Sequence, residues 1–507
     1  MTNKRKASRD ADRRRRPWIV TAVLLFGTYA VAMNLTVLGI ALPPIASDLG
    51  AGARISPDWV IGAYFVAIVV VQPAVGGLGD RWGRRRVYNI SIAAFAAGSV
   101  LCTVAPTMTL LIGGRIVQGL GGGAIMPLAT AMVYEMFPPH RRGLALGVWG
   151  IAMMAAPALG PPVGGWVVTA ASWRWIFLLL TAVSVVGLLL GLALLHETGR
   201  RAADAKARRP LDWGGWALAS AGVITLVLVS RHVPEHGLTA TGLVTAVAAV
   251  AALAVLVRRS LRRPDPLIDF RMFAFTIFTA AMIVIFINAL AQYARLTYLP
   301  VEFQVIRDMT ARDVGLLLSP AAIAVAVTMP LGGWLADRIG SRVPVVIGLI
   351  GMAVPTLALA RLSPDTPVAW ILAVLIVQGL GMGISMMPTT VAAMNVLPGR
   401  FVAQASSLTA LNRQISGAVG TAFLAALLVA ALGSVSPEGP HTAAEIAKAQ
   451  DAYNHIFLTT ACALAAAVVP ALFLPGRRRM RALQRERAAE QEEGEERGGT
   501  PDAPPAS

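Results

Sequence analysis

The chain has 507 residues, of which 56% are hydrophobic and only 14% charged, and its mean hydropathy is +0.65. A soluble globular protein carries about 25% charged residues, so this chain has too few to cover a soluble surface of its size. Its net charge of +17 would suit a nucleic-acid partner in a soluble protein, but the basic residues follow a membrane topology, and we expect no nucleic-acid partner.

Fourteen apolar segments of roughly 20 residues follow one another along the chain, a length that crosses a bilayer. The first is too long for the apolar core of a signal peptide and is predicted to remain as a helix. The pattern predicts an all-α polytopic membrane protein with 14 transmembrane helices, at residues 17–42, 57–79, 86–104, 108–134, 142–168, 173–196, 212–231, 238–257, 272–300, 314–334, 343–361, 367–391, 402–432 and 455–475.

Basic residues gather on one side of this predicted topology. The two termini and the even-numbered loops hold 34 of the 44 Lys and Arg residues. Because loops rich in Lys and Arg stay in the cytoplasm, we expect a multi-pass protein of the cell membrane with both termini cytoplasmic. The basic surplus is then a topology signal, with some affinity for anionic lipid headgroups.

Two sequence patterns occur twice. Residues 116–127 read IVQGLGGGAIMP and residues 376–388 read IVQGLGMGISMMP, while residues 76–86 read GGLGDRWGRRR and residues 333–342 read GWLADRIGSR. Both pairs appear in the same order at nearly the same offset, which predicts two pseudo-symmetric six-helix bundles. Parallel repeats of this kind are typical of transporters, with the substrate site midway through the bilayer between the halves.

The repeats divide the chain into five parts. A basic cytoplasmic tail, 1–16, precedes the N-terminal bundle, 17–198. A linker with two inserted transmembrane helices, 199–264, separates it from the C-terminal bundle, 265–475. The tail 476–507 is charged and is predicted to be cytoplasmic and partly disordered.

The loop after the second segment combines glycines, an aspartate and arginines. Glycines permit a tight turn and close helix approach, and the aspartate can sit against a helix N-terminus while arginines form charge-assisted bonds. An ordinary capped turn is the alternative, but the repeat favours a latch. The candidate cytoplasmic gate residues are Gly76, Asp80, Arg81, Gly83, Arg84, Arg85, Asp337, Arg338 and Arg342.

The fourth segment carries Arg115 before its glycines. A guanidinium at the bilayer centre costs about 2.5–3.5 kcal/mol or more, so Arg115 must face a polar cavity or a partner. Its repeat counterpart is Leu375, while Gln118 and Gln378 are both present. The fold therefore does not require a charge there. The glycines indicate helix packing rather than a dinucleotide site, because no strand precedes them.

Three further segments carry unusual residues for a membrane helix. Residues 156–165 read APALGPPVGG, a pattern that predicts a bent, closely packed helix, with motif residues Pro157, Gly160, Pro161, Gly164 and Gly165. Residues 406–422 contain Asn412 and Arg413, and the arginine either faces a cavity or snorkels. Residues 33–43 read MNLTVLGIALP and contain Asn34 and Thr36.

Together these motifs resemble those of the major facilitator superfamily, in particular its fourteen-helix branch of drug:proton antiporters of the multidrug resistance type. The resemblance covers residues 17–475. It implies that the 76–86 loop is a cytoplasmic latch and that Arg115 handles protons or contacts substrate. It also implies export, because symporters are expected to lack the 156–165 motif. The branch usually has Asp where this chain has Asn34, which favours a cavity position for Asn34, with an interhelical hydrogen bond as the alternative.

An amide cannot exchange a proton near neutral pH, so coupling through a carboxylate in the first helix is not available. None of the 27 acidic residues falls in the middle third of a predicted segment. We therefore expect neutral, zwitterionic or anionic amphipathic substrates rather than permanent cations. The candidate substrate and proton cavity residues are Asn34, Thr36, Arg115, Gln118, Asn288, Gln292, Tyr293, Gln378, Asn412 and Arg413.

These observations predict a secondary active transporter, acting as a monomer, that exports drugs or natural products by alternating access in exchange for protons. An ATP-driven pump is excluded, because none of the four lysines follows a glycine as a phosphate-binding loop requires. An uncoupled facilitator is the main alternative. A polytopic membrane enzyme is a lesser one, since the six histidines lie near segment ends or in loops without an H-E-x-x-H motif. We expect no catalytic residues, metal or cofactor.

Overall fold

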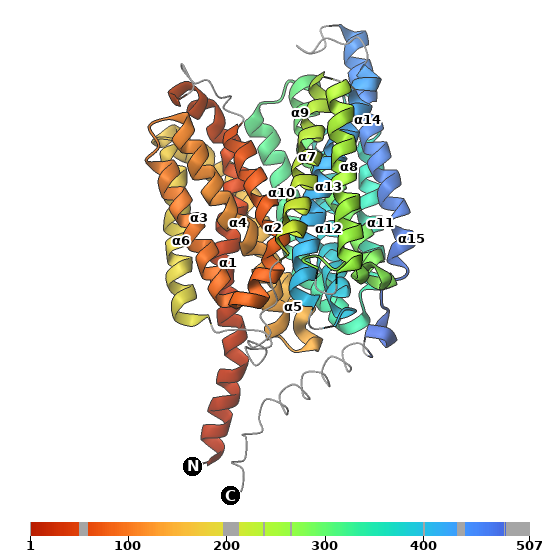
Figure 1. The fold of residues 1–507 in the computed structure, drawn as a ribbon. Coiled ribbons are helices and arrows are strands. Elements are labelled where there is room, and N and C mark those ends of the chain that lie inside the picture. The colour runs from red at the N-terminus through yellow and green to blue at the C-terminus, as the bar shows by residue number, and fades with distance from the viewer. Residues whose placement is uncertain are drawn as a thin grey trace, which may run out of the picture.

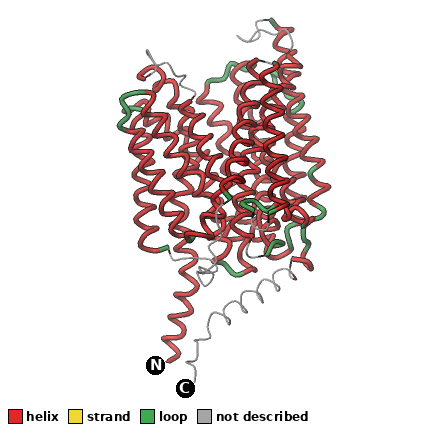
Figure 2. The backbone as a smooth tube through the Cα atoms, in the orientation of Figure 1, coloured by secondary structure: helices red, strands yellow, loops and turns green. Residues whose placement is uncertain are grey.

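The computed structural model describes residues 2–49, 59–195, 212–236, 239–263, 266–398, 401–432, 442–480 and 482, and these form helices and connections without a strand. The helices run up and down through one bundle (Figure 1), and their connections gather at its two ends (Figure 2). We call the end where α1 begins the basal end and the opposite end the distal end. The helices are α1 (Thr2–Leu49), α2 (Trp59–Trp82), α3 (Arg84–Thr103), α4 (Met108–Met136), α5 (Arg142–Ala170), α6 (Arg174–Leu194), α7 (Trp213–His236), α8 (Ala240–Arg262), α9 (Thr276–Ile306), α10 (Ala311–Ile339), α11 (Arg342–Leu359), α12 (Val368–Asn395), α13 (Val402–Leu432), α14 (Ala443–Ala466) and the short α15 (Val468–Ala471).

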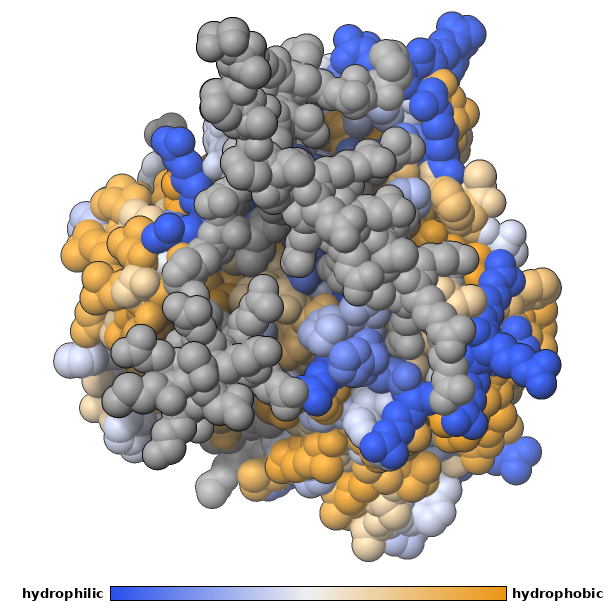
Figure 3. Space-filling view, turned by 90° about the horizontal axis from the view of Figure 1, so that it is seen from below, coloured by the Kyte–Doolittle hydropathy of each residue, from blue (hydrophilic) through white to orange (hydrophobic). Residues whose placement is uncertain are grey.

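Twelve helices of the described chain are long and apolar enough to cross a membrane. Two further helices, α5 and α7, bring the number of up-and-down helices to the predicted fourteen. The helix α5 runs for 29 residues, and α7 has a shorter apolar part at Trp213–Leu226. Large apolar side chains cover the flank of the bundle, where Val250 and Val327 are 67% and 68% exposed. Seen from the basal side (Figure 3), hydrophobic side chains surround the molecule and hydrophilic ones gather on that face and its rim. The predicted all-α, fourteen-span class is confirmed.

Several helices extend beyond their predicted segments, and α1, α9 and α14 extend furthest at one end, because polar residues continue them. The backbone of α1 is helical from Thr2, so the basic segment 1–16 prolongs the first helix. The helix α9 continues to Ile306, past the predicted end at residue 300. The helix α14 starts at Ala443 rather than 455, because Thr442 and Glu445 form a capping box, with their side chains each accepting a backbone N–H bond at 3.2 and 3.0 Å.

The repeated glycines make the same packing contact in both parts of the chain. A Cβ added to Gly119 of α4 would lie 2.5 Å from the carbonyl oxygen of Tyr64, and one added to Gly379 of α12 would lie 2.4 Å from that of Ala321. Tyr64 and Ala321 stand 257 residues apart, the offset of the repeated loops. Glycine alone permits helices to approach this closely. The bundle boundaries at 198 and 265 adjoin residues outside the described set and stay a prediction.

Of the two inserted helices, α7 packs against both α2 and α13, and α8 packs against α7. Trp216 Nε1 and Ser220 Oγ of α7 both donate to the carbonyl oxygen of Val70 in α2, at 2.7 and 3.2 Å. At the basal end, Asp212 accepts from Arg259 of α8 at 3.0 Å and from Arg263 just after it at 2.7 Å. The insert is therefore fixed to one helix of each repeat.

Asp212 is a buried carboxylate at the basal start of α7. Burial alone would raise its pKa. Hydrogen bonds from Arg259 and from the Gly215 N–H, together with the charges of Arg259 and Arg263, outweigh burial and hold the pKa below its ordinary value.

Candidate functional site

Arg115 lies inside α4 and is almost completely enclosed, with 1% of its surface exposed. Its Nε donates to the carbonyl oxygen of Val60 at 2.8 Å, and its Nη1 donates to Asn34 Oδ1 at 2.7 Å and to Gln118 Oε1. In the described part of the chain, the guanidinium forms no ion pair. Neutral oxygens therefore satisfy this charge, as a membrane-embedded arginine requires.

Aromatic rings complete the enclosure of Arg115. Its Cζ lies 4.2 Å from the ring centroid of Tyr64 on α2 and 5.9 Å from that of Phe177 on α6. A guanidinium over a ring face is attracted by the ring quadrupole, more strongly where water is excluded. The sequence did not indicate the ring of Tyr64, because this residue belongs to no repeated or unusual pattern.

Asn34 is the point where this cluster differs from the pattern it resembles. The residue is 1% exposed, and its Oδ1 accepts from Arg115, while its Nδ2 has no hydrogen-bond partner among the described residues. An aspartate here would offer two acceptor oxygens and a negative charge. The amide leaves Arg115 positive and uncompensated, so this part of the protein has a positive potential.

Gln118 and Gln378 make matching bonds in the two repeats. Gln118 Nε2 donates to Ser99 Oγ of α3, and Gln378 Nε2 donates to Thr356 Oγ1 of α11, both at 2.7 Å. Gln118 also holds Arg115, whereas Leu375 occupies that position beside Gln378. Gln378 thus ties α12 to α11 and is not brought into the cluster around Arg115.

A second group of predicted residues lies around a small cavity between α9, α12 and α13. Asn288, Gln292 and Arg413 line this cavity of about 10 Å³ together with Met382 and Met386. A space of this size holds about one water molecule. The predicted residues of the C-terminal part therefore meet, but around a nearly closed space.

Hydrogen bonds fix the walls of this cavity. Arg413 Nη2 donates to Thr390 Oγ1 at 3.5 Å, and Asn288 Nδ2 donates to Ser385 Oγ at 3.3 Å. Two predicted residues join α9 to α13 beside it: Tyr293 donates to Gln414 Oε1 at 3.5 Å, and Asn412 Nδ2 donates to the Met282 carbonyl at 2.9 Å. Arg413 thus points inward in this conformation.

Thr36 and the glycines of α5 hold α1 against α5. Thr36 Oγ1 donates to the carbonyl oxygen of Ala156 at 3.2 Å, and a Cβ added to Gly160 would lie 2.2 Å from Thr36 Oγ1. Gly164 is buried, whereas a Cβ added to Gly165 would meet nothing within 4 Å. The helix passes through this motif without interruption. The side chains of Pro157 and Pro161 lie outside the described set.

The predicted gate residue Asp337 lies near the end of α10 and contacts the start of α5. Its Oδ1 accepts from the Gly143 N–H and its Oδ2 from the Leu144 N–H, both at 2.9 Å. These are orphan donors in the first turn of α5, where a carboxylate also meets the positive end of the helix dipole. The carboxylate of one repeat thus caps a helix of the other.

Glycines allow α5 and α10 to touch at this point. A Cβ added to Gly143 would lie 2.1 Å from the carbonyl oxygen of Gly333, and one added to Gly333 would lie 1.9 Å from that of Gly143. Next to them, Tyr134 of α4 donates to Asn395 Oδ1 of α12 at 2.6 Å, a link that the sequence did not indicate. The basal end is therefore closed by direct contact between the two repeats.

The equivalent loop after α2 is organised by Arg84, which is 6% exposed. Arg84 Nη2 lies 3.3 Å from Asp80 Oδ1, and its Nη1 pairs with Glu135 of α4. Arg85 Nη2 donates to the Leu192 carbonyl at 2.7 Å. Here the arginines hold helices of the N-terminal part together.

The remaining predicted gate residues shape the two loops. Gly83 and Gly340 have positive φ values of 89° and 88°, which glycine adopts without strain, and they end α2 and α10 at corresponding positions. Gly76 brings α2 within 3.2 Å of the backbone of Ala403 on α13, measured from an added Cβ. Arg338 stacks 4.4 Å above Trp334, Arg342 Nε donates to the Leu474 carbonyl at 3.0 Å, and Arg81 is exposed.

Comparison with known proteins places this geometry in a family. A family model described as Major Facilitator Superfamily matches residues 24–421. The chain is similar to the Multidrug resistance protein B homolog of Mycobacterium tuberculosis strain H37Rv, at 32% identity over 413 residues, which cover 80% of this chain and 75% of the relative. It is also similar to the Tetracenomycin C resistance and export protein of Streptomyces glaucescens, at 28% identity over 92% of this chain and 85% of the relative.

Solved structures share the fold at low sequence identity. A proton:xylose symporter, XylE, bound to 6-bromo-6-deoxy-D-glucose aligns with a TM-score of 0.65 at 14% identity, covering 93% of this chain and 99% of the other. The human organic anion transporter MFSD10 (TETRAN) aligns with a TM-score of 0.62 at 16% identity, covering 90% and 99%. At these identities the likeness concerns the fold alone.

Proposed function

The chain belongs to the Major Facilitator Superfamily, and from this premise we propose that it exports small amphipathic compounds by alternating access in exchange for protons. Its family and fold are those of transporters rather than of enzymes. Several relatives carry names that refer to drug resistance or export, among them the tetracenomycin C protein. The resemblance of its motifs to those of drug:proton antiporters supports the same direction of transport.

The observation that carries the proposal is the basal contact between α5 and α10. At this contact the two halves meet through one carboxylate and two glycines, so they can separate here without unpacking either half. Separation would release the α5 N-terminus and Asp337 to water, where both are solvated. We therefore assign the latch to Asp337 with Gly143 and Gly333, and the structure to a basal-closed state. The two halves that move relative to each other during transport are then the bundles 17–198 and 265–475, with the helices of residues 199–264 beside them.

The basal end is proposed to face the cytoplasm. Both the basic start of α1 and the arginines of the α2–α3 and α10–α11 loops lie at this end, and positive loops are retained inside. The protein then sits in the cell membrane with both termini inside, and a basal-closed state is open to exchange with the outside. Because one chain contains both repeats, we propose that it acts as a monomer.

The charge of the site favours certain substrates. Arg115 is buried and Arg413 is half-buried, and the position where the resembled pattern has an acid is the amide Asn34, which contacts Arg115. A positive potential disfavours a permanent cation and suits neutral, zwitterionic or anionic amphipathic compounds. Of the predicted cavity residues, we propose that Asn288, Gln292 and Arg413 contact substrate, while Asn34 and Gln118 hold Arg115.

Drug susceptibility in a bacterial host stripped of its exporters tests the proposal. Three probes are compared. The first is tetracenomycin C, the second is an anionic detergent, and the third is ethidium, which is a permanent cation. We expect expression of the chain to raise resistance to the first two and not to ethidium. Resistance to ethidium that the Asn34→Leu variant abolishes would overturn the substrate assignment. Transport in proteoliposomes that does not respond to a pH gradient would instead favour the uncoupled facilitator.

A further inference from the structure

The distal part of α9 holds a carboxylic acid that the site above does not use. Glu302 lies four residues before the end of α9 and has 0% of its surface exposed. It packs against α14 within an apolar cluster that includes Tyr298, Phe303 and Tyr453. A carboxylate without a cationic partner is costly in such surroundings, whereas the neutral acid is not.

The hydrogen bonds of Glu302 indicate which form is present. Gln450 Nε2 of α14 donates to Glu302 Oε1 at 2.7 Å. The other oxygens of the two groups, Glu302 Oε2 and Gln450 Oε1, are buried without a partner among the described residues. Both oxygens are acceptors when Glu302 is ionised, so neither can satisfy the other. A proton on Oε2 would make it a donor, and an acid and a primary amide can then exchange two hydrogen bonds.

Few charges face this group. Arg307 directly follows α9, but its Nη1 and Nη2 donate to the Thr366 and Ser363 carbonyls at 2.8 and 2.6 Å. Within the described residues no Lys or Arg lies within 4 Å of the Glu302 carboxyl. Other titratable and charged groups around it lie on or next to α9, on α10, on α14 and in the α11–α12 loop. Six of them are exposed: Asp313, Lys448, Asp451, His455, Arg361 and Asp365. The other four are Arg295, Tyr298, Arg307 and Tyr453.

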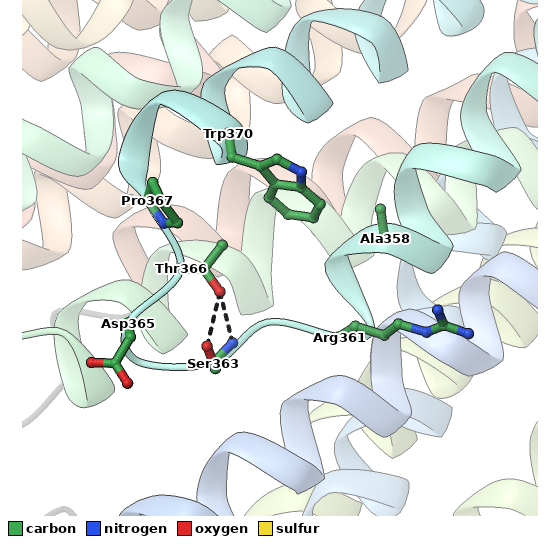
Figure 4. Close-up of a pocket in the computed structure, with 7 residues that line it drawn as sticks. All are labelled: Ala358, Arg361, Ser363, Asp365, Thr366, Pro367 and Trp370. Atoms are coloured by element: carbon green, nitrogen blue, oxygen red, sulfur yellow. Dashed lines mark hydrogen bonds between the residues drawn. The ribbon is translucent and has the colours of Figure 1, made fainter.

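A hydrogen-bonded chain connects Glu302 to the distal surface. Gln450 Nε2 also donates to Asn454 Oδ1 at 3.2 Å, and Asn454 Nδ2 donates to the Leu362 carbonyl at 3.1 Å. Leu362 belongs to the loop between α11 and α12, which surrounds a cavity of about 470 Å³ lined by Arg361, Ser363, Asp365 and Trp370, among others (Figure 4). Gln450 and Asn454 thus link the buried acid to the backbone of the loop that borders this cavity.

We propose that Glu302 binds the coupling proton, holding it on Oε2 in this basal-closed state after taking it from water on the distal side, with Gln450 holding the acid in place. The step is a simple acid dissociation: the O–H bond forms or breaks, and the proton is exchanged with water. Release requires the α9–α14 contact to loosen, because one neutral donor stabilises a buried carboxylate poorly. The assignment rests on the proposed proton-coupled export and explains how a chain with Asn34 can couple to protons.

Infrared spectroscopy of the full-length protein in lipid nanodiscs tests the protonation directly. The wild-type protein is expected to show the C=O stretch of a buried carboxylic acid that is absent from Glu302→Gln and retained in Asp451→Asn, a control on the exposed face of α14. Gln450→Leu should move the band to higher frequency, because the acid loses its hydrogen bond. If Glu302→Gln does not accumulate in the membrane, the band shift of Gln450→Leu alone tests whether Glu302 is protonated. Identical spectra for the wild type and these variants would overturn the assignment.

Transport in proteoliposomes separates this inference from the proposed function. With tetracenomycin C as the probe, we expect Glu302→Gln to exchange substrate without a gradient as the wild type does. Its accumulation ratio under a pH gradient should fall to the value measured without one, while Asp451→Asn responds fully. Equal responses of the wild type and Glu302→Gln would overturn the role of Glu302 and leave proton coupling intact. A wild type that ignores the gradient would overturn both.

Discussion

The hydrogen bonds that the Asp337 carboxylate accepts from α5 join the two halves, and the isosteric change to Asn weakens them with little change of shape. Asp337→Asn keeps one acceptor oxygen but turns an N–H₂ group toward a backbone N–H of α5 and removes the charge at the helix start. A hydrogen bond to a charged group contributes about 1.5–3 kcal/mol, and a charge at a helix terminus about 0.3–1 kcal/mol. We therefore expect the basal-closed state to lose about 2–3 kcal/mol relative to states in which residue 337 is solvated, a change in their ratio of roughly 30-fold to 140-fold.

Spin-label distances across the basal end measure this change. Arg86 and Val343 are exposed residues near the basal starts of α3 and α11, at corresponding positions of the repeat, and accept labels away from the latch. Cys462 is exposed and is replaced by Ala, whereas Cys102 is buried. Asp337→Asn should increase the population of long distances by the ratio above.

The repeat itself offers the matched control for this experiment. Asp80→Asn makes the same change in the equivalent loop, where the carboxylate accepts from Arg84 of its own half at 3.3 Å. We expect a much smaller shift of the distance distribution from this variant. Superimposable distributions for the wild type and Asp337→Asn would refute the latch.

Three further predictions concern the glycine contact, the buried arginine and the insert. Gly333→Ala places a Cβ 1.9 Å from a backbone oxygen of α5 and should destabilise the basal-closed state by about 1–3 kcal/mol in the same distance measurement. Gly315→Ala on the same helix meets nothing within 4 Å and should stabilise the protein by up to about 1 kcal/mol, so equal effects would contradict the contact. Arg115→Lys loses the Nε bond to α2 and should lower transport at least tenfold while the protein stays folded, as judged by thermal unfolding; wild-type transport would show that the enclosure is only structural. Asp212→Asn should lower the free energy of unfolding by about 1–3 kcal/mol at neutral pH. Because the folded-state pKa of Asp212 is lowered, its contribution is present above the unfolded pKa and lost as pH falls through the folded value, so melting in acid should not distinguish this variant from the wild type; an equal difference at both pH values would contradict the ion pairs.

The helices and their repeat could be predicted because both depend on local sequence. Apolar length defines a span, and the glycines of α4 and α12 recur at the offset at which Tyr64 and Ala321 meet them. Hydropathy failed where polar residues continue a helix. The predicted ninth segment ended at residue 300, so Glu302 was placed outside the span although it is buried within α9.

The partners of the site residues could not be predicted in the same way. Asp80 was expected against a helix N-terminus, but it accepts from Arg84, and its counterpart Asp337 caps α5, which begins 195 residues earlier in the chain. Arg115 was expected to need a polar partner, and Asn34 and Gln118 provide it, yet the ring of Tyr64 carries no sequence signal. Contacts between distant segments follow from packing, which spacing along one chain does not specify.

Proton flux during transport tests the account most directly. Purified protein is reconstituted in proteoliposomes that contain a pH indicator, and tetracenomycin C is supplied on one side. We expect its movement to carry protons the opposite way, and an imposed proton gradient to drive it against its own concentration. Movement of the compound at the same rate with and without the gradient, and without any change of the indicator, would contradict proton-coupled export.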